Sequence, residues 1–109
     1  MAKLEPSQVI TANGDYTYQT IPGRLYYFNL GYLAGTGTVT VKKRIGYSGT
    51  NYDTYKLPSD PTAVMALAAT GTETGYDVRA SSNQIVFTVS GATGLQLKID
   101  IGEVKNGRS

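Results

Sequence analysis

The stretch from Gln84 to Val104 constrains the fold of this chain most. Its second half alternates strictly between apolar and polar side chains, with the apolar positions at Leu95, Leu97, Ile99 and Ile101. A period of two residues places alternate side chains on opposite faces of a β-strand. In the first half Ile85, Phe87 and Val89 alternate with Val86, Thr88 and Ser90, and Gly91-Ala92-Thr93-Gly94 separates the two halves. The stretch therefore predicts a β-hairpin with one apolar face and one polar face.

Length and composition extend this prediction to the whole chain. The 109 residues suffice for one domain, and nine Tyr and thirteen Gly suit pleated strands separated by turns. Turn signals at Asn13-Gly14, Pro22-Gly23 and Gly35-Thr36-Gly37 divide the chain into short strands, several of which we expect to pair as hairpins. The predicted fold is all-β: a single antiparallel β-sandwich of jelly-roll type, or a flattened barrel, with about eight strands.

The sequence divides into an arm, a domain and a tail. Residues 1–6 are predicted to form an N-terminal arm that joins the domain only after Pro6, because proline cannot donate a hydrogen bond to a strand ladder. Residues 7–105 form the β-sandwich domain, and residues 106–109 are a C-terminal tail.

Two places in the middle of the chain break the strand pattern. Lys43 falls on the apolar face of residues 38–45, which indicates either a strand that runs past the core or a bulge. Asp60 before Pro61 resembles the start of a helix, and the alanine-rich run that follows has good helix propensity. The same run also fits a strand, and we favour a strand for Asp60–Ala69.

The composition argues against most kinds of catalysis. The chain has no His and no Cys, which excludes His-dependent catalysis, thiol chemistry and most transition-metal sites. No pair among the eight acids has a recognisable catalytic spacing, although Asp77 and Asp100 lie on polar strand faces. We therefore predict a protein that is not an enzyme and has no cofactor and no metal site.

Charge and hydropathy argue against two classes of partner. The net charge is only +2, and the one basic cluster, Lys42-Lys43-Arg44, is too small for a specific nucleic-acid surface. No apolar run approaches the ~18 residues that a membrane span needs, and the N-terminus has no signal-peptide pattern. We expect synthesis in the cytoplasm and no membrane partner.

The tyrosines carry the strongest functional signal. Tyrosine in a loop is a good interface anchor, because it buries a large area and keeps a polar tip. The loop from Tyr47 to Tyr55 is therefore a predicted contact site, through Tyr47, Asn51, Tyr52 and Tyr55.

Two motifs resemble small bacteriophage virion proteins. One is Val-Ser-Gly-Ala-Thr-Gly at Val89 to Gly94, followed by the alternating last strand. The other is Gly-Thr-Val-Thr-Val at Gly37 to Val41 with the Tyr-Ser-Gly-Thr-Asn-Tyr turn at Tyr47 to Tyr52. The resemblance covers roughly residues 25–101 and implies a β-sandwich that decorates or cements a phage capsid, or belongs to the tail.

This resemblance also implies a set of partners. They would be the major capsid protein or another virion protein, and further copies of the chain, with a trimer favoured. The protein would be made in the host cytoplasm and end in the virion. The arm would dock through Lys3, Leu4, Glu5 and Pro6. The alternative is a tail or fibre module that binds a host-surface carbohydrate through the loop tyrosines.

Overall fold

The computed structural model describes residues 2–45, 51–69, 71 and 73–104. These residues contain strands and no helix, so the all-β prediction is confirmed. Eight strands form one sheet that is folded over on itself, and β6 and β7 form a separate pair. The strands are β1 (Ala2–Lys3), β2 (Ser7–Ile10), β3 (Gly14–Gln19), β4 (Leu25–Arg44), β5 (Tyr52–Thr54), β6 (Lys56–Leu57), β7 (Asp60–Val64), β8 (Ala66–Ala69), β9 (Thr74–Arg79) and β10 (Gln84–Glu103).

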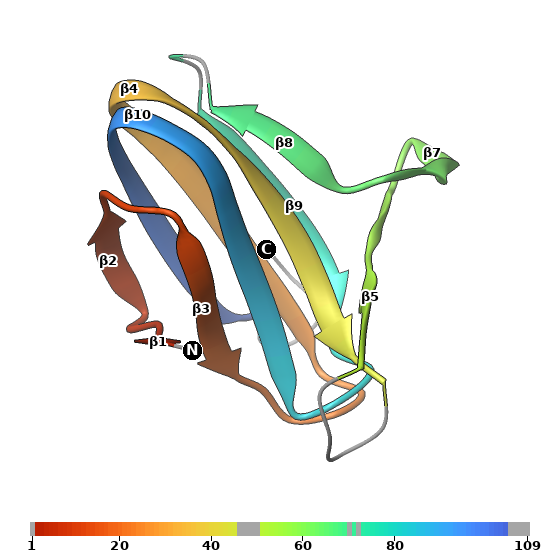
Figure 1. The fold of residues 1–109 in the computed structure, drawn as a ribbon. Helices are drawn as coiled ribbons and strands as arrows, with labels where there is room; N and C mark the ends of the chain where they lie inside the picture. Colours follow the sequence, from red (N-terminus) through yellow and green to blue (C-terminus); the bar gives the residue numbers. More distant parts are fainter. Residues whose placement is uncertain (1, 46–50, 70, 72, 105–109) are drawn as a thin grey trace.

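Two strands of 20 residues each, β4 and β10, form the frame of the molecule. They pair antiparallel along their whole length, from Lys43 opposite Ile85 to Tyr26 opposite Glu103. Both bend near their midpoints, where the register shifts between Ser90 and Leu97. Figure 1 shows the two strands arching over together, so each contributes one half to each layer of a sandwich.

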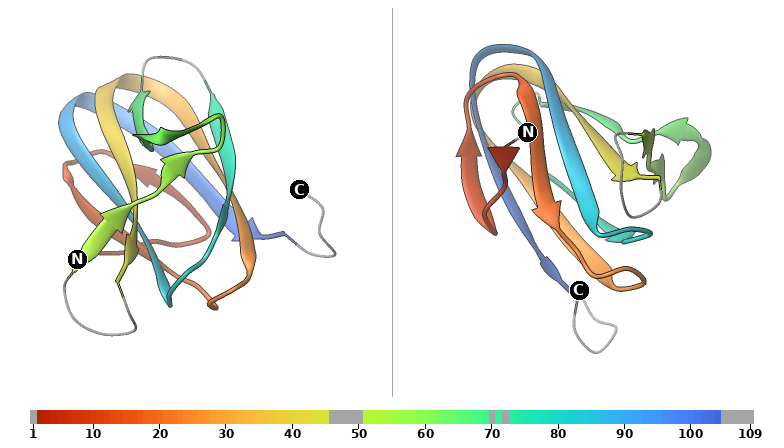
Figure 2. Two further views of the ribbon diagram at one scale, coloured as in Figure 1. Left: turned by 90° about the vertical axis from the view of Figure 1, so that its right-hand side faces the viewer. Right: turned by 60° about the horizontal axis from the view of Figure 1, so that its bottom comes forward.

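The shorter strands extend the two layers on either side. Layer A consists of the first half of β10 and the second half of β4, flanked by β3 with β1 on one side and by β5 and β8 on the other. Layer B consists of the second half of β10 and the first half of β4, flanked by β2 and β9. All of these pairings are antiparallel except the short one between β1 and β3. Figure 2 shows the two layers from two further directions.

The predicted hairpins are therefore wrong, and the glycines explain why. The two halves of β10 do not pair with each other, since both pair with β4, and β2 and β3 pair with different halves of β10. Gly35 and Gly94 have positive φ angles of 80° and 58°, which favour glycine. They bend the paired strands around a corner instead of reversing the chain.

The alternation that predicted two faces is confirmed. Leu97 and Ile99 are buried under the opposite layer, whereas Gln96 and Lys98 are exposed. Phe28 of layer B meets Phe87 of layer A edge to face, with ring centroids 5.3 Å apart. Such aromatic contacts, together with the aliphatic residues around them, hold the layers together.

The strand reading of residues 60–69 is also confirmed. Residues Asp60–Val64 pair with β6, and Ala66–Ala69 pair with β4. Between them, Met65 is 1% exposed and fixes the segment to the core. Asp60 accepts hydrogen bonds from the Thr62 amide and hydroxyl, which lower the pKa of its carboxyl group. Its role is to close a turn, not to start a helix.

The irregularity at Lys43 results from a strand that runs past the core. Pairing between β4 and β10 continues through Lys42 and Lys43 without a register shift, so there is no bulge at this point. The Lys43 ammonium lies 5.4 Å from the centre of the Tyr55 ring, and Ile45 is 58% exposed.

The N-terminal residues belong to the sandwich. Ala2–Lys3 pair with β3, Leu4 donates a backbone hydrogen bond to Thr17, and its side chain is buried in the core. Pro6 lacks a donor, but its carbonyl accepts a hydrogen bond from the Ile101 amide at 2.9 Å. The expectation that the chain joins the domain only after Pro6 is thus wrong. The predicted tail, residues 106–109, lies outside the described residues.

The corner glycines give a stability prediction. A Cβ atom on Gly35 would overlap the backbone of Gly94, and the residue would keep a positive φ. Gly35→Ala should therefore lower the free energy of unfolding by about 2 to 5 kcal/mol, from backbone strain and overpacking combined. Urea denaturation measures the change. Gly37→Ala is the matched control, because its Cβ would make only ordinary contacts. Equal stability of the two variants would contradict this account of the corner.

Candidate functional site

Residues from the predicted arm and the predicted loop lie on the same outer face of layer A. One row of paired positions crosses four neighbouring strands of layer A, with Lys3 on β1, Thr17 on β3, Val86 on β10 and Lys42 on β4. In the neighbouring row Gln19 is opposite Gln84, and the next strands place Arg44 opposite Tyr52. Side chains at paired positions point to the same face of a sheet. We call these two rows the layer A face.

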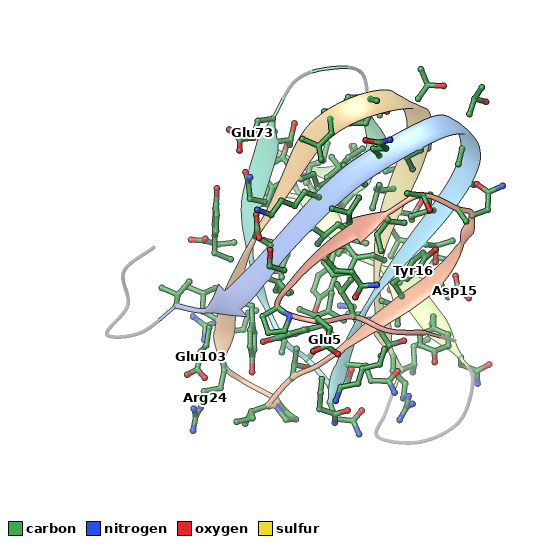
Figure 3. The ribbon with its side chains drawn as sticks, turned by 90° about the vertical axis from the view of Figure 1, so that its left-hand side faces the viewer. Glu5, Asp15, Tyr16, Arg24, Glu73 and Glu103 are labelled. Carbon is green, nitrogen blue, oxygen red and sulfur yellow. The ribbon has the colours of Figure 1, made fainter. Side chains whose placement is uncertain are left out.

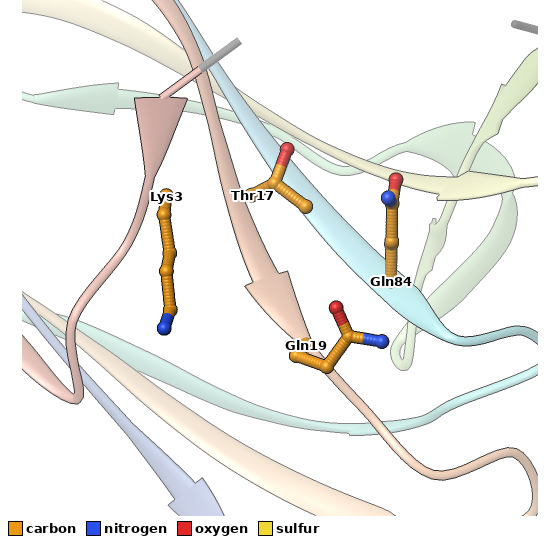
Figure 4. A pocket seen from close by; sticks show the side chains of 4 residues that line it. All are labelled: Lys3, Thr17, Gln19 and Gln84. Carbon is orange, nitrogen blue, oxygen red and sulfur yellow. The ribbon is translucent and has the colours of Figure 1, made fainter.

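Part of the layer A face is hollow. Figure 4 shows the depression, which has a volume of about 290 Å³ and is lined by Lys3, Thr17, Gln19 and Gln84. Thr17 Oγ1 is buried and has no hydrogen-bond partner among the described residues. Val86 also points to this face but is only 1% exposed, because its neighbours cover it. The hollow therefore presents one ammonium, two amide groups and one hydroxyl group.

Tyr52 connects the predicted loop to a residue that lines the hollow. Its hydroxyl donates a 3.4 Å hydrogen bond to Gln84 Oε1, so the ring lies beside the amide that lines the hollow. Asn51, next to it, is exposed, and its carbonyl accepts a hydrogen bond from Ile45. Tyr47 lies outside the described residues.

Tyr55 has a different position from Tyr52. Its ring packs against the core, and its hydroxyl donates to the Arg79 carbonyl at 3.1 Å. Burial raises the pKa of this hydroxyl above its ordinary value. These contacts tie β5 to the end of β9, so Tyr55 is mainly a packing residue of the domain.

The four residues predicted to dock the arm differ in their exposure and in whether they line the hollow. Leu4 is 1% exposed and belongs to the core, so its side chain is not accessible to a partner. Lys3, Glu5 and Pro6 are exposed. Only Lys3 lines the hollow.

The outer faces of the two layers differ in charge. The outer face of layer A carries three cations, Lys3, Lys42 and Arg44, and one acid, Asp15. The outer face of layer B carries three acids, Asp77, Asp100 and Glu73, and two cations, Lys98 and Arg79. Glu73 accepts a 2.7 Å hydrogen bond from Asn29. Figure 3 shows Glu73 on the layer B side of the molecule and Asp15 at the edge of layer A. A partner of layer A is thus expected to be acidic or rich in hydrogen-bond acceptors.

The acids do not form a catalytic pair in the described part of the chain. Asp77 is opposite Tyr27 and Asp100 is opposite Asn29 on β4, so the two acids are two inter-strand spacings and two residues apart, roughly 12 Å, on an open face. In residues 2–45, 51–69, 71 and 73–104 no group of three acids is placed to hold a metal ion. The same residues contain no helix long and apolar enough to cross a membrane.

No protein-family model matches the chain, and no curated protein or solved structure shows significant similarity to it. The resemblance to phage virion proteins therefore stays a prediction from the sequence motifs. The function has to be argued from the chemistry of the surface.

The sequence did not single out three of the four residues that line the hollow. Thr17, Gln19 and Gln84 occupy outward positions of strands, where polar residues are ordinary. The signal is their polar alternation with inward Tyr18 and Ile85, which marks a face but not a depression.

Burial of Leu4 gives a prediction about the arm. Leu4→Ala should lower the free energy of unfolding by about 2 to 5 kcal/mol, because it removes a fully buried side chain. Glu5→Ala should change it by less than about 0.5 kcal/mol, since Glu5 is exposed and bonds to Gln8 through its backbone amide. Urea denaturation of both variants tests this, and a neutral Leu4→Ala would show that the arm is not part of the core.

Proposed function

We propose that this protein is a non-enzymatic structural protein of a bacteriophage virion that decorates or cements the capsid. One observation carries the proposal: the arm and the loop, which are far apart in the sequence, contribute Lys3 and Tyr52 to adjacent rows of one sheet face. Because the rigid sheet already holds both side chains in place, little conformational entropy is lost when a partner binds. The sequence motifs that resemble phage virion proteins point to the same class.

The charge of the layer A face specifies the kind of partner surface. Lys3, Lys42 and Arg44 favour an acidic patch on the major capsid protein or another virion protein, and Tyr52 supplies an aromatic anchor. The more acidic outer face of layer B would then point away from that patch, because like charges across an interface weaken binding.

The test uses phage particles assembled without the protein. Purified protein should bind them and raise the temperature at which they rupture. Lys3→Glu should weaken binding by at least about tenfold, because it reverses a charge on the contact face. Lys98→Glu is the matched control, an exposed lysine on the outer face of layer B, and should bind as the wild type does. Particles that neither bind the protein nor gain heat resistance would refute the proposal.

A second function is favoured by the hollow itself. Its two amides and one ammonium, with Tyr52 alongside, suit the hydroxyl groups and ring face of a sugar. The protein would then be a tail or fibre module that binds a host-surface carbohydrate.

A glycan array distinguishes the two functions. For a carbohydrate module, the wild type should bind a defined set of glycans, and Tyr52→Ala should lose that binding. Tyr27→Ala, which removes a 39% exposed tyrosine from the outer face of layer B, should keep it. Absence of binding by all three proteins would exclude the carbohydrate function and leave the capsid function in place.

A further inference from the structure

Strand β8 is an exposed edge of layer A. Along one side it pairs with β4, from Ala66 opposite Thr40 to Ala69 opposite Gly37. No other described strand pairs with it. About half of the backbone N–H and C=O groups of an edge strand point away from the sheet, where another strand can pair with them.

The sequence of β8 lacks the usual protection of such an edge. Proteins commonly place charged residues or proline on edge strands to prevent pairing with other chains. From Thr62 to Thr72 the sequence has neither, and Ala66 and Ala68 place small exposed side chains on the outer face. Val64, just before the strand, is 47% exposed.

The other edges of the sheet are protected. The β3 edge carries Asp15 and is partly covered by β1 with Lys3. The β9 edge carries Asp77 and Arg79, and β2 follows Glu5 and Pro6 directly. Among the edges described, β8 alone has no charge or proline in it or immediately before it.

We propose that β8 pairs with β8 of a second copy of this chain, antiparallel and around a two-fold axis. Antiparallel pairing makes a strand complementary to itself, so one edge serves both copies. Two uncharged strands, each of three alanines and one leucine, meet without charge repulsion, and a net charge of +2 gives little repulsion between whole molecules. The pairing would join the A layers of both copies into one continuous sheet. It does not depend on the proposed function, and it differs from the trimer that the sequence resemblance implies.

The first test is the mass of the full-length protein in solution. Sedimentation equilibrium should give twice the 11.7 kDa of one chain at high concentration. Ala68→Lys should weaken dimerisation by more than about tenfold, because it places like charges close together across the two-fold axis. The matched control Val9→Lys, at a 47% exposed apolar position on β2, should remain a dimer. A wild type that is monomeric or trimeric, or a dimer that Ala68→Lys leaves intact, would overturn the proposal.

A second measurement avoids any variant that fails to fold. Hydrogen exchange of the wild-type protein should slow at the amides of Ala66 to Ala69 as concentration rises, while exchange in β9 stays unchanged. Exchange in β8 that is independent of concentration would also overturn the proposal.

Discussion

The structure depends on the joint bend of β4 and β10. These strands pair over their full length and turn the corner together, so the sheet folds onto itself without losing its ladder. Every other strand of the main sheet except β1 pairs with one of them. Gly35 and Gly94 make the corner possible, because a side chain on Gly35 would collide with the backbone of Gly94. The two layers are thereby held in one fixed relation.

Asn13 has a different role here from that of an asparagine in a two-residue hairpin turn. Asn13 stands before a glycine, a combination typical of a two-residue hairpin. In the structure the Asn13 Oδ1 accepts a hydrogen bond from the Ala92 amide at 2.8 Å, and the flanking strands pair with different halves of β10. Asn13 therefore links the β2–β3 connection to the bend in β10. The local signal marked a change of direction correctly but did not identify the partner strand.

Folding of the arm onto the sheet connects the architecture to the proposed function. Leu4 enters the core and holds Lys3 beside Thr17, while Tyr55 fixes β5 through the Arg79 carbonyl. Leu4 thus positions the exposed Lys3 in the arm, and Tyr55 positions the partly exposed Tyr52 in the loop. A contact surface built in this way is rigid, which reduces the entropy lost when a partner binds.

The sequence by itself determined the fold class and the buried face of residues 95–101, because side-chain alternation and turn propensity are local properties. For Asp60–Ala69 it favoured a strand over a helix, and the pairing of this segment with β6 and β4 decided between them. The tertiary structure alone decided that the apparent hairpins are bent strands, that Leu4 is a core residue and that Lys3 and Tyr52 share a face. These features depend on which strands pair, and pairing is set by burial between residues far apart in the chain. The hollow beside Gln84 has the same origin, since its lining comes from three strands.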